Sequence, residues 1–273
     1  MAAKTKKTEY ECGKGTFKEL DDKITKVFKL KADIRTMKEQ RELAMKGVAE
    51  KLGDISGITE YTERDLGNGM FVTVMPPYTA NRFDDKVYTQ WLEDHGLMDE
   101  AYKKFIYREL DEVRETLRFS SEYIKDVENT FTSFKNYIAD AELPDLAATC
   151  ADLKTEIRKL ENEYKSTVSC IMSMGLEKMG DDLFGAKFVY RQDGISGTLS
   201  FSRSYKRSFN IARAGEMLPE EMPEGERDAI LKGKTVTVLS HVISVLTEDA
   251  VKKLHEHANQ TENCQPEEAE ICI

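Results

Sequence analysis

The chain has no long apolar run, no closely paired cysteines and no catalytic motif. None of its apolar runs approaches the roughly 20 residues that a membrane-spanning helix requires, so we expect no contact with a membrane. Five cysteines are scattered without a CxxC pair, at positions 12, 150, 170, 264 and 272, which predicts free thiols rather than disulfides or a zinc site. The first residues carry lysines but no apolar core, which predicts no secretory signal and a cytoplasmic protein.

Residues that could support catalysis or bind a metal are not grouped. The stretch CGKGT (Cys12 to Thr16) lacks the GxxxxGK[ST] spacing of a phosphate loop. His255 and His257 would point about 200° apart on a helix, and no third ligand is evident. Acid pairs such as Asp84 and Asp85 stand where helices begin, and capping explains them. We therefore predict a protein that is not an enzyme, with no cofactor and no metal.

Positive charge is outnumbered by negative charge over the whole chain but is concentrated in one segment. The 273-residue chain has a formal net charge of −10, which argues against a general polyanion binder. From Lys187 to Arg213, however, six cations stand against one acid, Asp193, a local net charge of +5. The sequence thus directs the search for an anionic partner to this segment.

A strand through this basic segment would alternate aromatic rings with arginines on one face. Such a face supplies stacking planes for bases and partners for phosphates, as a surface for single strands or frayed ends requires. The alternative is that the rings pack on the helices while the arginines extend to water. The predicted nucleic-acid-binding residues are Lys187, Arg191, Phe201, Arg203, Tyr205, Lys206, Arg207, Phe209 and Arg213.

Two long helical patterns dominate the expected fold. Residues 17–52 contain no proline and carry an apolar stripe that Arg41 interrupts, and a cleaner seam begins near Asp145. Each is followed by glycines and a strand pair, so we predict a mostly helical α+β fold in which long coiled-coil-like helices each precede a small antiparallel hairpin. The shared order indicates a degenerate duplication. Shorter helices are expected after Asp84 and over residues 99–118 and 121–141, and one bulged strand near Ser240.

Composition divides the chain into four expected segments. These are a flexible basic N-terminus (1–16), a domain with the first long helix and hairpin (17–144), a second coiled-coil helix with antiparallel strands (145–258) and a disordered acidic tail (259–273). The tail resembles the acidic, hydrophobic-tipped C-terminus of single-stranded DNA-binding proteins, which implies a partner-binding end; the alternative is a solubilising end. Its candidate residues are Glu267, Glu268, Glu270, Ile271 and Ile273.

Pro76 and Pro77 end a predicted strand, because neither can donate to a ladder and each fixes its own φ. We interpret them as a rigid corner between the hairpin and the helix that Asp84 caps.

The path around this corner resembles the Gam-like host-nuclease inhibitor family of Mu-like phages. The resemblance covers residues 17–117, less than half of the chain. It rests on the stretch VMPPYTANRFDDKVYTQWLEDHGL and the charged segment that follows, with matching positions Val74, Pro76, Pro77, Val87, Leu92, Gly96, Leu97 and Arg108. The order of helix and hairpin also resembles a family of siphovirus coiled-coil accessory proteins, through GLEKMGDDLFGAKFVYR in the second half.

These resemblances imply a phage early protein in the cytoplasm of an infected bacterium. The Gam-like family forms dimers whose paired helices enclose duplex DNA ends and exclude host exonucleases. The expected function is therefore non-enzymatic binding that shields DNA ends or single-stranded DNA, in a homodimer or higher oligomer built through the coiled coils. The alternative is a protein-directed inhibitor or adaptor that binds a host nuclease or defence complex without contacting nucleic acid.

Overall fold

The structure is a computed structural model that describes residues 8–12, 18–119, 123–192 and 194–261. It is a mostly helical α+β protein, which confirms the expected fold class. The chain forms two compact units, each assembled from three segments. Unit 1 comprises Met1–Thr25, Pro77–Ser120 and Val168–Leu239; unit 2 comprises Lys26–Pro76, Ser121–Thr167 and Ser240–Ile273.

The two longest helices are those that the apolar patterns predicted. The helices are α1 (Lys18–Leu52), α2 (Asp85–Asp94), α3 (Met98–Lys103), α4 (Tyr123–Asp140), α5 (Leu143–Met179), α6 (Ile211–Ala214), α7 (Glu224–Leu231) and α8 (Glu248–Thr261), with 3₁₀ turns η1 (Gly180–Gly185) and η2 (Gly215–Met217). Asp84 caps α2 by accepting from the backbone N–H groups of Lys86 and Val87. No helix among the described residues is both long and apolar enough to span a membrane.

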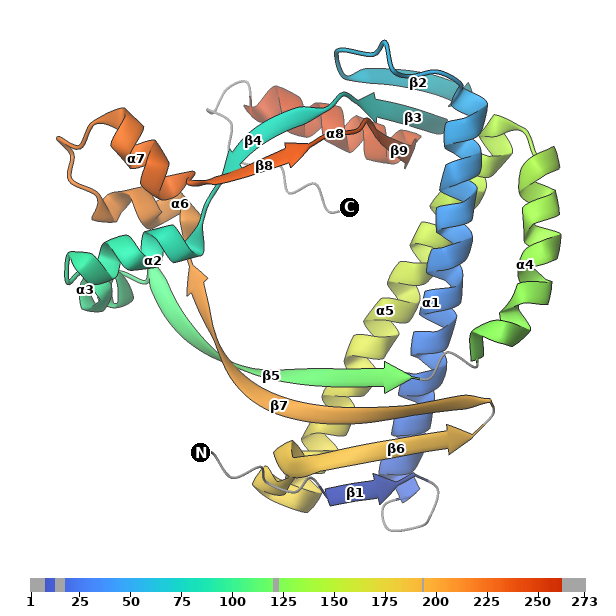
Figure 1. Ribbon diagram of the computed structural model, residues 1–273, viewed down its shortest axis with the longest axis horizontal. Coiled ribbons are helices and arrows are strands. Elements are labelled where there is room, and N and C mark those ends of the chain that lie inside the picture. The colour runs from blue at the N-terminus through green and yellow to red at the C-terminus, as the bar shows by residue number, and fades with distance from the viewer. Residues whose placement is uncertain (1–7, 13–17, 120–122, 193, 262–273) are drawn as a thin grey trace. The chain divides into compact units, whose positions relative to one another are not determined.

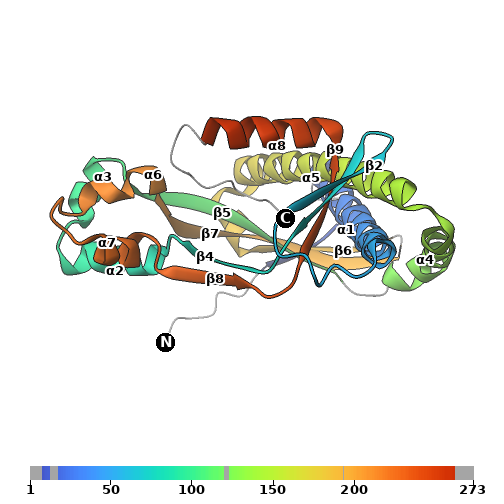
Figure 2. The ribbon, with the colours of Figure 1, turned by 90° about the horizontal axis from the view of Figure 1, so that it is seen from above.

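The strands form three sheets (Figure 1). They are β1 (Thr8–Glu11), β2 (Thr62–Gly67), β3 (Met70–Met75), β4 (Tyr78–Arg82), β5 (Tyr107–Phe119), β6 (Ala186–Gln192), β7 (Ile195–Phe209), β8 (Lys234–Val238) and β9 (Val242–Thr247). Unit 1 holds the sheet β1-β6-β7-β5 and the pair β4-β8, whose strands lie side by side in both views (Figures 1 and 2). Unit 2 holds the sheet β2-β3-β9.

In unit 2, α1 and α5 pair as antiparallel helices within one chain. Ala44 and Val48 share a buried cluster with Leu146 and Cys150 at one end of the pair. Further along the pair, Lys38 forms an ion pair with Glu161 at 2.6 Å, and Lys26 forms one with Glu163 at 2.5 Å. The seams therefore close within the chain, and their pairing needs no second copy.

In unit 1, the four-stranded sheet buries one face. Phe188, Tyr190, Leu199 and Phe201 are at most 1% exposed. The first turns of α1 and the last turns of α5 belong to this unit, and their buried side chains include Leu20, Ile24 and Ile171. A second cluster, around Tyr88, Leu92, Ile106 and Ala214, joins α2, α3 and α6 to the start of β5.

Each half of the chain lends a strand to the hairpin of the other half. The hairpin β2-β3, which follows α1, pairs with β9 from the second half. The hairpin β6-β7, which follows α5, pairs with β5 from the first half. The repeated order of helix and hairpin is thus present, but the compact units cross the boundary at residue 144 instead of following it, because the third strand of each sheet is exchanged.

Three local predictions are wrong. Residues 99–118 form α3 and then β5 rather than one helix, because β6 pairs only with residues 195–200 of β7 and the rest of that strand needs a backbone partner. The bulged strand near Ser240 is two strands in different sheets, β8 and β9. Residues 8–11, expected to be flexible, form β1, which pairs in parallel with β6.

The two prolines also lie in a different corner from the one expected. Pro76 and Pro77 stand between β3 and an unpredicted strand, β4, rather than directly before α2. Pro76 is the last residue of its segment in unit 2, and Pro77 is the first of its segment in unit 1. The fixed φ angles therefore act where the chain passes from one unit to the other.

Candidate nucleic-acid interface

Strand β7 is extended as the sequence predicted, and its partners define two faces. Residues directly opposite one another in an antiparallel pair project to the same side of the sheet. Phe201, Arg203, Tyr205 and Arg207 therefore share a side, while Ser200, Ser202, Ser204 and Lys206 occupy the other. The two faces of β7 differ in both burial and ion pairing.

The face that the sequence indicated as a binding surface is largely committed to the fold. Phe201 is 1% exposed, and Phe209 packs at 5.3 Å between ring centroids against both Tyr88 and Tyr107. Tyr205 is the exception, with 76% of its surface exposed. These rings belong mainly to the interior of unit 1, which matches the alternative of packed rings.

The arginines on or beside this face have carboxylate partners. Arg203 lies 3.4 Å from Asp181 and stacks 4.6 Å from the ring of Phe184. Arg207 lies 3.4 Å from Glu93. On α6, Arg213 makes two hydrogen bonds of 2.7 and 2.8 Å to Glu216; this hydrogen bonding, followed by the charge, lowers the pKa of Glu216. An approaching phosphate would have to compete with these acids.

The opposite side of the sheet, here called the hydroxyl face, is polar and accessible. Its side chains come from three adjacent strands, and most are exposed or half-buried. They are Arg108, Leu110, Glu112, Arg114, Thr116 and Arg118 of β5, Lys187, Val189 and Arg191 of β6, and Thr198, Ser200, Ser202, Ser204, Lys206 and Ser208 of β7. Hydroxyl groups and cations are the side chains that commonly contact phosphate oxygens.

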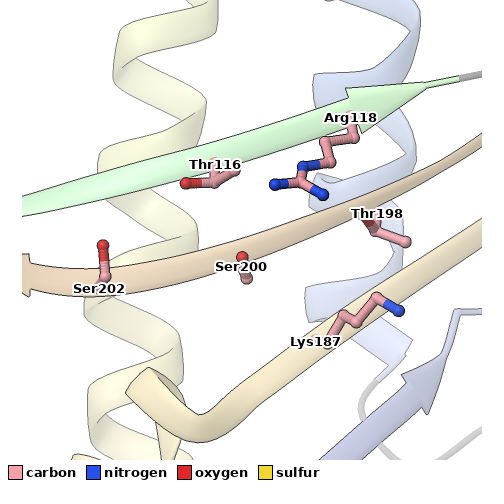
Figure 3. Close-up of a pocket in the computed structure, with 6 residues that line it drawn as sticks. All are labelled: Thr116, Arg118, Lys187, Thr198, Ser200 and Ser202. Atoms are coloured by element: carbon pink, nitrogen blue, oxygen red, sulfur yellow. The ribbon is translucent and has the colours of Figure 1, made fainter. Parts of the chain in front are cut away.

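At one end of the hydroxyl face lies an open hollow of about 360 Å³. Figure 3 shows its six lining residues, which come from all three strands, with the guanidinium of Arg118 extending into the space between β5 and β7. The lining consists of Thr116, Arg118, Lys187, Thr198, Ser200 and Ser202. Four hydroxyl groups and two cations thus surround a space that is open to solvent.

The hydroxyl face carries more positive than negative charge. Six cations project from β5, β6 and β7, against Glu112 and the two glutamates of β1, Glu9 and Glu11. Lys187 pairs with Glu9 at 2.7 Å, and this hydrogen bond and charge lower the pKa of the carboxyl group. Arg114 binds Glu112 at 3.1 Å. Among the described residues, Arg118, Arg191 and Lys206 have no carboxylate within 4.0 Å.

The predicted sites are therefore divided by the fold. Lys187, Arg191 and Lys206 lie together on the hydroxyl face, whereas Phe201, Arg203, Tyr205, Arg207 and Phe209 lie on the other side and Arg213 lies on α6. Glu267, Glu268, Glu270, Ile271 and Ile273 lie outside the described residues.

Sequence reasoning missed the contribution of β5. Arg108, Arg114, Thr116 and Arg118 were assigned to a helix, so their alignment with the serines of β7 was hidden. The composition of the two faces of β7 could have predicted which of them is exposed. Leu199 and Phe201 make one face the better candidate for burial, so the serine face is the one expected to be exposed to solvent.

The described residues contain no cluster of three or more His, Cys, Asp or Glu side chains suited to a metal ion. Comparisons of the chain with protein-family models, with curated proteins and with solved structures gave no match.

Proposed function

We propose that this protein binds nucleic acid through the phosphate backbone, using the hydroxyl face of unit 1. The observation that carries the proposal is the alignment of hydroxyl groups with three cations, Arg118, Arg191 and Lys206, that have no carboxylate within 4.0 Å in the described part of the chain. Contacts to phosphate from arginine, lysine, serine and threonine position a protein on nucleic acid without reading its sequence. Binding of this kind is independent of sequence and sensitive to salt.

The dimensions of the face suit a linear polyanion. Arg108 and Arg118 stand at opposite ends of β5, and ten residue steps of about 3.4 Å separate them by roughly 34 Å along the strand. A stacked strand places one phosphate every 3.4 Å or so, which gives room for several successive contacts. The net charge of −10 restricts such contacts to this local surface.

The biological role that we propose is protection of DNA ends or single-stranded DNA from nucleases. This role is inferred from the resemblance to Gam-like phage proteins, which also implies a location in the cytoplasm of an infected bacterium. In the Gam-like family, a dimer encloses the DNA. Here α1 and α5 pair within one chain, so a single copy presents the hydroxyl face, and assembly into a homodimer remains a separate prediction.

Two matched triple variants test the proposal. The first changes Arg118, Arg191 and Lys206 to Gln; the second changes Arg203, Arg207 and Arg213 to Gln. Both remove three positive charges, but from different surfaces. Affinity for a fluorescent 20-nucleotide single strand and a blunt 20-base-pair duplex is measured by anisotropy over a salt series. Loss of about three phosphate contacts should flatten the slope of log affinity against log salt by about 2 for the single strand.

The expected result is that the first variant loses at least tenfold in affinity at low salt while the second stays within about threefold of the wild type. Equal losses in the two variants would show that net charge, rather than the hydroxyl face, governs binding. Absence of binding by the wild-type protein at low salt would refute the proposal and favour the protein-directed adaptor. Nuclease digestion of linear DNA in the presence of each variant then tests protection.

A further inference from the structure

Two consecutive helices end in the same hydrogen-bonded motif but with different residues at its critical position. After α2, the N–H of Gly96 donates to Glu93 O at 3.1 Å and that of Leu97 donates to Leu92 O at 2.8 Å. This is a Schellman motif, in which the residue after the cap adopts left-handed geometry. Gly96 has φ +67°, a conformation that glycine tolerates without steric cost.

After α3 the motif recurs with phenylalanine in place of glycine. The N–H of Phe105 donates to Tyr102 O at 3.1 Å and that of Ile106 donates to Ala101 O at 2.9 Å. Phe105 has φ +57°. The other described non-glycine residue with positive φ is Asn68, a residue type that visits this region readily. A bulky side chain there is an outlier that strains the backbone.

The ring of Phe105 makes few contacts that could offset this strain. Its side chain is 61% exposed, whereas the next residue, Ile106, is fully buried in the cluster with Tyr88 and Leu92. Within the described part of the chain, Phe105 forms no aromatic pair, and its cation–π contact is with Arg108, whose guanidinium lies 5.0 Å from the ring centroid. Ile106 therefore anchors the turn, and the turn displays Phe105 to solvent.

The position of Phe105 connects it to the hydroxyl face. Arg108 stands opposite Ser208 and is the first cation of that face, at the end far from the hollow around Arg118. Lys103 and Lys104 precede Phe105 and are exposed, with Lys104 paired to Glu100 at 2.8 Å, and Tyr102 is 59% exposed. An exposed ring beside cations at the end of a phosphate track is the combination that stacks an unpaired base.

We infer that Phe105 is a base-stacking residue, which makes single strands or frayed ends, rather than continuous duplex, the preferred ligand of the hydroxyl face. This inference rests on the proposed function and adds the class of nucleic acid. A base inside a duplex has both faces covered by its neighbours, so only an unpaired or terminal base can stack on the ring. Arg108 holds the ring from one side and leaves the rest of it accessible.

The test separates the ring from the strain by comparing Phe105→Gly with Phe105→Ala. Glycine removes both the ring and the strain, so the melting temperature should rise by about 2–5 °C. Alanine removes the ring but keeps a Cβ at positive φ, so the melting temperature should stay closer to that of the wild type. Both variants should lose about tenfold in affinity for a 20-nucleotide oligothymidylate, whereas Phe105→Trp should retain it.

Three controls make the outcome specific. An abasic oligomer of the same length and a continuous circular duplex contain no unpaired base, so their affinities should not change in either variant. Tyr205→Ala removes another exposed ring, on the opposite side of β7, and should bind as the wild type does. The inference is overturned if Phe105→Gly binds oligothymidylate normally, if it loses affinity for the abasic oligomer equally, or if it melts below the wild type.

Failure of the inference can be told apart from failure of the proposed function. If the wild type binds and the Arg118, Arg191 and Lys206 variant loses affinity, while the Phe105 variants do not, the backbone contacts stand and the stacking role falls. If the wild type binds neither oligothymidylate nor the abasic oligomer, both proposals fall.

Discussion

Replacing Arg41 with methionine should stabilise the protein, although it removes a charged side chain from helix α1. Arg41 interrupts the apolar stripe of α1, between Met37 and Ala44. Its Nε atom is buried and has no hydrogen-bond partner. Burial, and then the like charges of Arg41 and Arg158, lower the pKa of Lys154 on α5. Among the described residues, none of these three cations has a carboxylate within 4.0 Å.

The size of the effect follows from these contacts. A buried N–H group without a partner costs about 1–3 kcal/mol. Methionine has a similar helix propensity to arginine and fills an irregular gap with a flexible apolar chain, so most of the packing of the arginine stem is kept. We expect a net gain of about 1–2 kcal/mol in the free energy of unfolding. In a chain of this size, that gain corresponds to roughly 2–8 °C in melting temperature.

Urea unfolding followed by circular dichroism at pH 7 measures this gain. Arg35→Met is the matched control, because Arg35 lies on the same helix but is exposed and paired with Glu39 at 3.1 Å, and its loss should change stability by less than about 0.5 kcal/mol. A lower urea midpoint for Arg41→Met than for the wild type would refute the reasoning.

The pH dependence supplies a second check on Arg41. The pKa of Lys154 is lower in the folded state than the ordinary value of 10.5, so its protonation opposes folding below the folded pKa, and stability is regained as the pH rises towards 10.5. Arg41→Met removes one cause of the lowered pKa, so this rise should be smaller in the variant.

One substitution tests the packing in unit 1, and one labelling experiment tests the state of the thiols. Gly175→Ala should lower the free energy of unfolding by about 1–3 kcal/mol, although alanine has the better helix propensity, because a Cβ there would lie 2.7 Å from Cδ1 of the fully buried Leu183. In urea titrations, the double variant with Leu183→Ala should lose less stability than the sum of the two single changes. Burial raises the pKa of Cys12 to about 12 and that of Cys150 to about 11. Iodoacetamide at pH 8 should therefore leave both thiols unmodified in the native protein and modify both in concentrated urea, as measured by mass spectrometry. Rapid labelling of either thiol in the native protein would contradict its burial.

Local patterns were sufficient for the elements that fold from local signals. The seams of α1 and α5 were visible as apolar residues three and four apart, and Asp84 and Gly96 marked the start and end of α2. The Asn-Gly pair at residues 68 and 69, both with positive φ, formed the expected hairpin turn between β2 and β3.

The segment from Ala101 to Phe119 shows where local patterns fail. Its apolar residues have helical spacing, and its first three residues do belong to α3 (Met98–Lys103). From Tyr107 onward, thirteen residues pair with β7, a partner about 90 positions away in the sequence. The local spacing of apolar residues contains no information about β7, a distant strand whose backbone groups need a pairing partner.

By itself, the sequence determined the two long helices, the hairpins that follow them and the concentration of positive charge in residues 187–213. It also determined that β7 would alternate between an aromatic face and a serine face. Only the tertiary structure decided which face is accessible, because burial depends on the partners that cover Phe201 and on the carboxylates that reach Arg203 and Arg207. Exchange of strands between the halves brought Arg118 beside Ser200 and Lys187, a proximity that no local spacing encodes.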